Sequence, residues 1–352
     1  MLTSLSVQNF RCIEDASLEL DPEGTGIIGP NGAGKTSLLE AIYFLAHGRS
    51  FRSAQRARLV GSLRAPLRVV GTIQHSRTIV AGVEYQAGTT RARVDGENVR
   101  TISRIAELLP VQVIDPSVHR LIEEGSTRRR RLLDWGVFHV EHGFMDPWRR
   151  YQRALAQRNA ALRTSAPGQS RLWEPELALC AADIDRMRRS YAQRLAPVFQ
   201  ALAAELSGRA CEIGYDRGWE EGLTLAEALA RSWPRDTRVR TTTVGPHRAD
   251  LIVRVDGEVA RERVSRGQQK VIAASLVLAQ ITLAAPSTVH RACLLLDDPA
   301  AELDVDNLGK ILSVIKRVPA QLVVTSLNKA GLRGINIGKR FHVEQGRFTE
   351  MV

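Results

Sequence analysis

Cysteine is scarce in this sequence. The 352 residues include four cysteines, and no two of them form a CxxC pair: Cys12, Cys180, Cys211 and Cys293. This spacing disfavours both a zinc site and a disulfide framework, and it fits a protein of the reducing cytosol.

Targeting signals and apolar runs of membrane length are also lacking. The first residues, MLTSLSVQNFRCIED, do not have the basic and then apolar layout of a secretory signal. The longest apolar run, Val271–Ala285, contains Gln280 and Thr282 and is too short to span a bilayer. We therefore expect a cytoplasmic protein.

Length and charge narrow the class of protein further. A chain of 352 residues is too long for one simple core, so two domains or one domain with an insertion are expected. Hydrophobic residues make up 44% and charged residues 25%, which is ordinary for globular proteins. The net charge of +11 favours a polyanionic partner, with nucleic acid as the first candidate. An arginine-rich, GC-biased proteome would explain the same charge without such a partner.

Alternating and apolar runs predict strands near both ends of the chain. Residues 1–20 indicate two strands, and residues 67–94 indicate a run of strands that ends in the turn Asp95-Gly96. The leucines before Asp297 suit a strand buried on both faces. The remaining expectations are helices at Ile102–Leu109, 268–285 and Leu308–Val318, strands at Val111–Ile114, 239–245, 250–257, 292–296 and Gln321–Thr325, and a hairpin at Phe341–Phe348.

Helical patterns fill the middle of the chain. A basic helix is expected at 126–138, and a second helix with Asp146 as its N-cap and Pro147 as its first residue. A long helix follows, in which apolar residues recur at three- and four-residue steps from Leu177 to Leu202. These last two helices would pack as an antiparallel arm, with a kink at Pro197. A helix buried in a globular lobe is the open alternative.

The stretch GPNGAGKT matches the phosphate-binding pattern GxxxxGK[ST]. An apolar run precedes it and an amphipathic helix, closed by Gly48, follows it. Glycines let backbone N–H groups turn toward phosphate oxygens, and the helix N-terminus adds its dipole. Lys35 would reach the β- and γ-phosphates, and Thr36 would offer a hydroxyl to Mg²⁺. The predicted nucleotide-binding residues here are Gly29, Pro30, Asn31, Gly32, Ala33, Gly34, Lys35, Thr36 and Ser37.

Two acidic residues follow the leucine-rich strand. Asp297 at the strand end can hold Mg²⁺ opposite the loop, directly or through water. Asp298 is placed to polarise a water that attacks the γ-phosphate. Lys35, Asp297 and Asp298 are thus the predicted catalytic residues, and Thr36 and Asp297 the predicted metal ligands. Glu302 and Asp304 would cap the next helix or contact a second subunit.

A second glycine-centred stretch, VSRGQQK, precedes an apolar helix. Ser265 and the N–H groups around Gly267 would form another anion-binding helix start, although a simple helix cap explains them as well. Because the chain also has a phosphate-binding loop and an acidic strand end, this stretch resembles the signature motif of ATP-binding-cassette ATPases. Ser265, Gly267 and Gln268 are then further candidate nucleotide contacts.

Together these stretches resemble the RecF family of SMC-like ATPases. The resemblance covers almost the whole chain and rests on eight stretches in order: NFR (9–11), GPNGAGKTSLLEAIY (29–43), GRSFR (48–52), LLDWGVFH (132–139), QRNAALR (157–163), GPHRADL (245–251), SRGQQK (265–270) and DDPAAELD (297–304). It implies an α/β fold, in which an ABC/SMC-type P-loop ATPase head carries an inserted, mostly helical arm domain. The head would comprise residues 1–139 and 241–352, and the arm residues 140–240.

The resemblance also implies a function. ATP, with Mg²⁺, would lie between the loop of one chain and Ser265–Gln268 of a second chain, so that ATP binding drives head-to-head dimerisation. The dimer would bind double-stranded DNA and single-strand/double-strand junctions, and slow, DNA-stimulated ATP hydrolysis would release it. With RecO and RecR it would load a recombinase in gap repair and replication restart and support the SOS response.

Some positions depart from the wider ABC pattern. Asp298 stands where a glutamate is usual, and no switch histidine follows the strand that ends at Thr325. Both departures suit a slow ATP-gated clamp. Arg266 replaces the glycine of transporters. The family also suggests that Arg11 and the arginines of GRSFR approach the nucleotide, unless the latter are surface residues, and that a glutamine loop lies near Gln112–Pro116.

Arginines in and before the predicted arm are candidates for DNA binding. Arg149 and Arg153 are four residues apart and share a helix face, which would grip phosphates without reading bases. A solvated helix face is the alternative for each of them. The named candidates are Arg128, Arg129, Arg149, Arg153 and Arg188. Two other functions remain open: a DNA scaffold with a relic nucleotide site, and a metabolic P-loop kinase.

Overall fold

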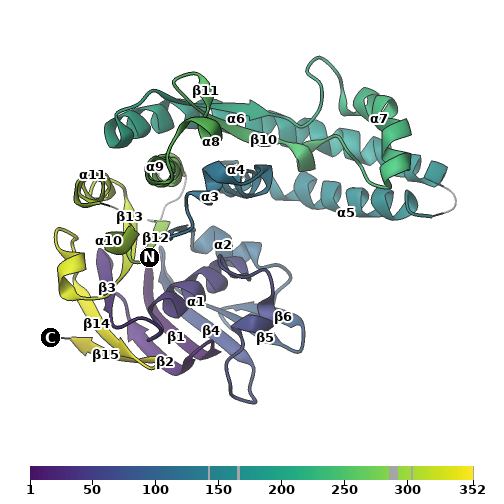
Figure 1. The fold of residues 1–352 in the computed structure, drawn as a ribbon. Coiled ribbons are helices and arrows are strands. Elements are labelled where there is room, and N and C mark those ends of the chain that lie inside the picture. Colours follow the sequence, from purple (N-terminus) through teal and green to yellow (C-terminus); the bar gives the residue numbers. More distant parts are fainter. Residues whose placement is uncertain (142, 165–166, 285–291, 303, 352) are drawn as a thin grey trace. The chain divides into compact units, whose positions relative to one another are not determined.

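The computed structural model describes residues 1–141, 143–164, 167–284, 292–302 and 304–351. They form two compact units, whose elements are labelled in Figure 1. Unit 1 comprises Met1–Val118 and Ala285–Val352, and unit 2 comprises His119–Ala284. The ends of the chain thus fold together in unit 1. The predicted head and arm, with boundaries near residues 140 and 240, divide the chain differently and stay a prediction.

Unit 1 contains two six-stranded sheets. The antiparallel sheet has the order β2 (Ile13–Glu19), β1 (Leu2–Phe10), β4 (Leu67–Gln74), β5 (Thr78–Gln86), β6 (Thr89–Val94), β7 (Glu97–Val99). The second sheet has the order β15 (Arg347–Met351), β14 (Lys339–Glu344), β3 (Gly24–Ile28), β13 (Ala320–Ser326), β12 (Ala292–Leu296), β8 (Val111–Ile114). All neighbours in the second sheet are parallel except β14 and β15.

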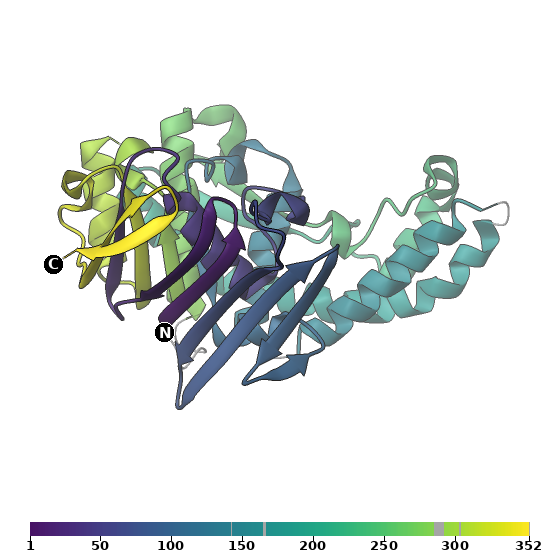
Figure 2. The same ribbon diagram turned by 90° about the horizontal axis from the view of Figure 1, so that it is seen from below.

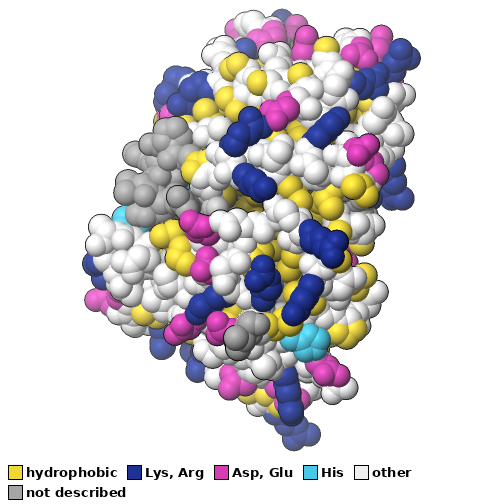
Figure 3. All heavy atoms as spheres, turned by 90° about the vertical axis from the view of Figure 1, so that its left-hand side faces the viewer, with side chains coloured by type: hydrophobic (Ala, Val, Ile, Leu, Met, Phe, Trp, Pro, Cys, Tyr) yellow, Lys and Arg dark blue, Asp and Glu magenta, His cyan; other side chains and the backbone are white. Residues whose placement is uncertain are grey.

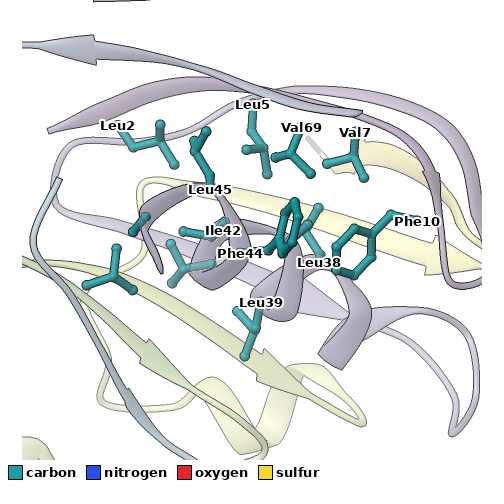
Figure 4. Packing of buried hydrophobic residues seen from close by; sticks show 14 of the residues in the cluster. Leu2, Leu5, Val7, Phe10, Leu38, Leu39, Ile42, Phe44, Leu45 and Val69 are labelled. Carbon is teal, nitrogen blue, oxygen red and sulfur yellow. The ribbon is translucent and has the colours of Figure 1, made fainter. Parts of the chain in front are cut away.

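One helix fills the core of unit 1. Helix α1 (Lys35–His47) begins after Gly34 and ends at Gly48, as predicted. Figure 4 shows Leu38, Ile42 and Leu45 of this helix beneath side chains of β1 and β4. Each of these three leucine and isoleucine side chains is fully buried, which contributes about 1.5–3 kcal/mol apiece. The helix that follows the phosphate-binding pattern is therefore held on a rigid core.

The smaller elements of unit 1 surround this core. They are η1 (Arg56–Leu59), α2 (Ser103–Leu108), α10 (Pro299–Glu302), α11 (Val305–Ile315) and η4 (Lys329–Leu332). None of the helices in the described ranges of the chain combines the length and the apolar character that a transmembrane span needs.

Unit 2 is mostly helical. It comprises α3 (Arg120–Glu123), α4 (Ser126–Val140), α5 (Met145–Ala161), η2 (Pro167–Trp173), α6 (Glu174–Ser207), α7 (Leu225–Val239), η3 (Pro246–Arg248), α8 (Ala260–Arg263) and α9 (Arg266–Ala284), with a three-stranded sheet of the order β11 (Glu258–Val259), β10 (Asp250–Val255), β9 (Cys211–Asp216). The long helix α6 packs against α5, as Figure 2 shows, and also against α4, α7, α9 and β9. Both expectations for it hold in part, because it pairs with α5 and is also the central helix of a lobe.

Buried arginines connect the helices of unit 2. Arg158 of α5 has no exposed surface, and it donates to Asp236 at 2.8 Å, to Thr242 at 2.8 Å and to Glu174 at 3.0 Å. Arginine can bind several acceptors at once because its guanidinium carries five N–H donors. This one side chain therefore joins α5 to α6, to α7 and to the segment after α7.

Two sequence predictions for this unit need correction. The predicted strand at 239–245 is wrong, because Val239 ends α7 and the threonines beyond it bond to polar side chains instead of a neighbouring strand: Thr243 donates to Asp236. Asp146 is not an N-cap, because α5 already begins at Met145. Helix α6 continues through Pro197 as one element, and the kink expected there stays a prediction. The predicted loop around residues 165–166 lies partly outside the described residues.

A buried glutamine helps to join the two sheets of unit 1. Gln321 of β13 is fully buried, accepts from the Leu2 amide at 2.8 Å, and donates to the Leu2 carbonyl at 2.7 Å and the Asp21 carbonyl at 3.0 Å. A buried backbone group without a partner costs about 1–3 kcal/mol. The amide of Gln321 thus fixes β1 against the start of β13, an inner strand of the parallel sheet.

We expect the substitution Gln321→Leu to lower the free energy of unfolding by about 2–4 kcal/mol, because it keeps the side-chain size but leaves the buried backbone groups of Leu2 and the partly buried carbonyl of Asp21 without partners. Urea unfolding followed by circular dichroism measures this. Gln8→Leu, at an exposed position of β1, is the matched control and should change the same quantity by less than about 0.5 kcal/mol. Equal effects of the two substitutions would contradict the role of Gln321.

A candidate nucleotide-binding site

Strand order brings the predicted nucleotide motifs of unit 1 together. In the parallel sheet β13 lies between β3, which leads into the phosphate-binding loop, and β12, which leads into Asp297. The carboxyl ends of parallel strands share one edge of a sheet, and ligands of open α/β sheets bind at that edge. The loop, Asp297 and the end of β13 therefore meet there.

The loop between β3 and α1 requires glycine at its ends. A Cβ atom at Gly29 would lie 2.3 Å from the Val343 carbonyl oxygen, which is too close for any side chain. Gly34 has a φ of 117°, a backbone conformation that other residues avoid. The loop is also braced by the final hairpin, since the Gly346 amide donates to the Ala33 carbonyl at 2.8 Å. The pattern GxxxxGK[ST] thus adopts the turn into a helix N-terminus that it predicts.

Lys35 curls back over this loop. Its ammonium donates to the carbonyls of Gly29 at 2.7 Å and Pro30 at 3.0 Å. Burial lowers the pKa of Lys35, and the negative charges of Asp298 and Asp297 oppose that shift. The lysine is therefore bonded to the loop and lies within electrostatic reach of both predicted carboxylates.

The carboxylate of Asp297 joins three elements. It accepts from the Thr36 hydroxyl of α1, which lies 2.9 and 3.0 Å from its two oxygens, and from the Thr325 hydroxyl of β13 at 2.8 Å. The side chain is buried except for 8% of its surface. Thr36 and Asp297 thus present two oxygen ligands in contact with each other, which is the kind of donor that Mg²⁺ prefers.

Asp298 has an unusual backbone. Its φ of 45° lies in the left-handed region, and its amide donates to the Thr325 hydroxyl at 2.9 Å. Such a conformation is uncommon for a residue with a side chain and clusters at functional sites. Here the left-handed conformation of Asp298 ends the extended course of β12 directly after Asp297.

Sequence reasoning did not find Thr325. Its hydroxyl donates to Asp297 and accepts from Asp298, so it orients both acidic residues. The only sequence signal is a hydroxyl at the end of a predicted strand, which is too common to single out. Cys12 was not assigned to this site either, although its sulfur lies 3.7 Å from the Ser37 hydroxyl and it is exposed.

Ser265 lies in unit 2 at the start of α9. Its hydroxyl accepts from the Gln268 amide at 3.4 Å, and its own amide donates to the Gln268 side chain at 3.0 Å. The helix-cap interpretation is therefore confirmed. Ser265, Gly267 and Gln268 are all exposed, so this cap leaves the helix start open to a ligand.

Four other positions in or beside the predicted motifs have clear surroundings. Asp304 caps α11 by accepting from the Asn307 amide at 2.8 Å, while the side chain of Glu302 lies outside the described residues. Gln112 is buried inside β8 and is not in a loop. The Arg11 guanidinium binds both carboxylate oxygens of Glu40. Ser326 ends β13 and donates to the Asn328 carbonyl.

The predicted DNA-contacting arginines differ in exposure. Arg149 and Arg153 are exposed on α5. Arg128 pairs with Glu124, and Arg129, which is 13% exposed, binds both oxygens of Asp250 at 2.8 Å.

Arg188 requires a correction. It is completely buried, donates to Asp134 at 2.9 Å and to the Pro246 carbonyl at 2.7 Å, and so is removed from the candidate contacts. The positions of basic side chains alone do not locate a DNA-binding surface, because lysine and arginine side chains are spread over the face shown in Figure 3.

Comparison with known proteins identifies the family. The model described as "RecF/RecN/SMC N terminal domain" matches residues 1–347. The DNA replication and repair protein RecF of Erwinia tasmaniensis is 38% identical over 99% of this chain and 98% of its own length. RecF of Pseudomonas aeruginosa is also 38% identical, over 99% of this chain and 97% of its own length.

Solved structures agree. The structure of the recombination mediator protein RecF-ATP in the RecFOR pathway has a TM-score of 0.88 at 25% identity and covers 100% of this chain and 97% of its own. The structure of an SMC head bound to the C-winged helix domain of ScpA has a TM-score of 0.61 at 17% identity. It covers 99% of this chain and 96% of its own chain, and at this identity the likeness supports only the fold.

The predicted ATPase-head fold is thereby confirmed. The strand order, the phosphate-binding loop and the relatives over almost the whole length agree with one another. The chain belongs to the RecF family of DNA replication and repair proteins.

Proposed function

We propose that this chain is an ATP-dependent DNA-binding protein of recombinational repair and replication-gap processing. The contact of Thr36 with Asp297, beside Lys35, carries the proposal, because it joins residues 261 positions apart into one site with the chemistry of a nucleotide phosphate. A solved relative with the same fold is described as the recombination mediator protein RecF-ATP. The head would comprise residues 1–139 and 241–352, with residues 140–240 as the arm.

ATP would bind through its phosphates at the loop Gly29–Ser37. The N–H groups of the loop and of the α1 N-terminus would surround the phosphates, and Lys35 would exchange its carbonyl partners for the β- and γ-phosphates. Thr36 and Asp297 would hold Mg²⁺, whose charge, when the ion is bound, offsets that of the phosphates. Thr325 keeps the Asp297 carboxylate oriented toward Thr36.

Asp298 would orient and polarise the water that attacks the γ-phosphate. Its carboxylate is one methylene shorter than the glutamate that is usual at this position, so its reach toward such a water is shorter. Slow hydrolysis follows, which suits a clamp that ATP closes and hydrolysis opens.

Lys35→Ala and Asp297→Asn should each lower ATP turnover by about 100-fold or more, because each removes a charge that stabilises the transferring phosphoryl group. Phosphate release in the presence of duplex DNA measures this. The controls are Lys310→Ala and Asp306→Asn, which make the same two types of substitution at exposed residues of α11. These two variants should turn over ATP at the rate of the parent protein. Unaltered turnover in the Lys35 and Asp297 variants would refute the site, and a parent without turnover would favour a scaffold with a relic site.

Dimerisation would complete the site. The exposed start of α9, with Ser265, Gly267 and Gln268, would bind the ATP held by the loop of a second chain. The reciprocal Ser265–Gln268 bonds prepare this helix start by fixing the hydroxyl and amide groups at it.

Ser265→Arg should leave ATP binding by the monomer intact and abolish ATP-dependent dimers, because the larger side chain blocks the helix start. Light scattering with a slowly hydrolysed ATP analogue measures dimer formation. The control is Thr224→Arg, which places the same side chain at the capping box of α7. If dimers persist in Ser265→Arg, or disappear in both variants, the assignment of the helix start to the interface is wrong.

DNA would be the partner of the ATP-bound dimer. The relatives are DNA replication and repair proteins, and one solved relative is placed in the RecFOR pathway. The proposed partners are therefore double-stranded and gapped DNA, RecO and RecR. The proposed roles are recombinase loading and support of the SOS response. The proposed location is the cytoplasm, where bacterial DNA lies. Arg149 and Arg153, with Arg128, would contact phosphates from unit 2.

DNA binding should weaken steeply with salt. If about five phosphates are neutralised, the slope of log affinity against log salt is near −4.5, and Arg149→Gln with Arg153→Gln should make it shallower by about 1.8. Fluorescence anisotropy with labelled duplex DNA across a salt series measures both slopes. Arg231→Gln with Arg261→Gln removes the same charge from exposed positions of α7 and α8 and should leave the slope unchanged. A flat dependence in the parent would overturn the electrostatic basis of binding.

A further inference from the structure

One long stretch of unit 1 carries positive charge without any negative charge. The chain has 38 acidic residues, yet none lies between Ala41 and Val83. The same stretch contains seven arginines: Arg49, Arg52, Arg56, Arg58, Arg64, Arg68 and Arg77. Like charges repel, so a surface of this kind costs energy unless an anion balances it.

The first five of these arginines lie in the connection between α1 and β4. Arg52, Arg56, Arg58 and Arg64 are exposed, and Arg49 is half-buried. Arg68 and Arg77 pair with Glu84 and Asp95. Arg56 donates only to the neutral Thr90 hydroxyl, and the described residues place no carboxylate in an ion pair with any of the first five. We call residues 49–64 the basic segment.

The basic segment is attached to the helix of the nucleotide site. Glu40 of α1 is fully buried and binds the Arg11 guanidinium at 2.8 and 3.0 Å. The Ser50 hydroxyl donates to the same carboxylate and accepts from the amides of Arg52 and Ser53 at 2.9 and 2.8 Å. Glu40 therefore joins the start of the segment to the helix that carries Lys35 and Thr36.

The end of β1 and the β1–β2 turn hold the rest of the segment. The Arg11 amide donates to the Leu59 carbonyl at 2.7 Å, and its guanidinium donates to the Arg58 carbonyl at 3.1 Å. Asn9 accepts from the Gly61 amide through its backbone and from the Leu63 amide through its side chain. The segment is thus an irregular but ordered surface, and its exposed guanidiniums are not needed for these contacts.

We propose that the basic segment is a second DNA-backbone contact surface, located on the ATPase unit and not on unit 2. It rests on the proposed function, which supplies DNA as the ligand. Arginine presents a planar fork of donors that matches phosphate, and contacts of this type position DNA without reading its sequence. The attachment through Glu40 gives this surface a fixed connection to the P-loop helix.

The composition of the segment favours nucleic acid over an acidic protein. Protein interfaces have an apolar, often aromatic centre, whereas DNA interfaces are more polar and much more positive. Among the described residues 49–64, Leu63 is the one exposed large hydrophobic side chain, at 42%. Serine, glutamine, alanine and arginine make up most of the remaining exposed surface.

The experiment compares three variants of the full chain in the anisotropy assay, with the slowly hydrolysed ATP analogue present. Arg52→Gln with Arg58→Gln and Arg64→Gln removes three charges and should make the salt slope shallower by about 2–3. The same three positions changed to lysine should keep the slope of the parent. Arg91→Gln with Arg333→Gln and Arg347→Gln removes three charges from exposed positions of unit 1 outside the segment, and it should also keep that slope.

Each result decides a different question. A parent with a flat slope would overturn the proposed function itself. A steep parent slope that falls equally in the segment and control variants would overturn the basic segment as a surface and leave the proposed function standing. Poly-L-glutamate is the second probe: if the segment variant loses affinity for it while keeping the DNA slope, the surface binds an acidic polypeptide and the proposal is wrong.

Discussion

The bond between Thr36 and the Asp297 carboxylate is the interaction on which the site depends. Thr36 is the second residue of α1, and Asp297 follows β12, so this contact forms only if α1, β3 and β12 are all in place. Thr325 of β13, the strand between them, donates to the same carboxylate. A buried carboxylate is expensive without hydrogen bonds, and two hydroxyls supply them here. The chemistry of the site and the order of the parallel strands are therefore one constraint.

Two buried polar side chains connect the antiparallel sheet of unit 1 to the elements around Asp297. Gln321 lies on the strand that also carries Thr325, and its side-chain amide binds the backbone of Leu2. Glu40 lies on the helix that also carries Thr36, and its carboxylate binds Arg11 of the β1–β2 turn. In both cases a buried polar side chain connects the antiparallel sheet to an element of the candidate nucleotide site. A displacement of β1 would therefore strain or break hydrogen bonds to α1 and β13.

Arginine has two separate roles in this chain. Arg158 and Arg188 are fully buried and link helices of unit 2 through ion pairs with Asp236 and Asp134. Burial raises the pKa of Asp134, and the charge of Arg188 opposes that shift. A buried cation of this kind is held by its partners and is not available to a nucleic acid. Fewer arginines are therefore open to a polyanionic partner than the net charge of +11 suggests.

The sequence by itself determined the local chemistry of this protein. The loop Gly29–Thr36 needs specific residues at short spacing, because glycine conformations, a helix start and a lysine act within one turn, and the buried strand before Asp297 is a local apolar run. Both were therefore predictable. The segment after helix α7 was not, because its β-branched threonines favour a strand until Asp236 and Arg158 supply other partners.

Only the tertiary structure decided which residues meet. Thr325 and Gln321 look ordinary in the sequence, and their roles come from the placement of β13 between β3 and β12 and against β1. Arg153 and Arg188 look alike in the sequence, yet one is exposed and the other fully buried. Hydrogen bonds and burial between distant segments depend on how strands are ordered and helices packed, and no short stretch of sequence contains that information.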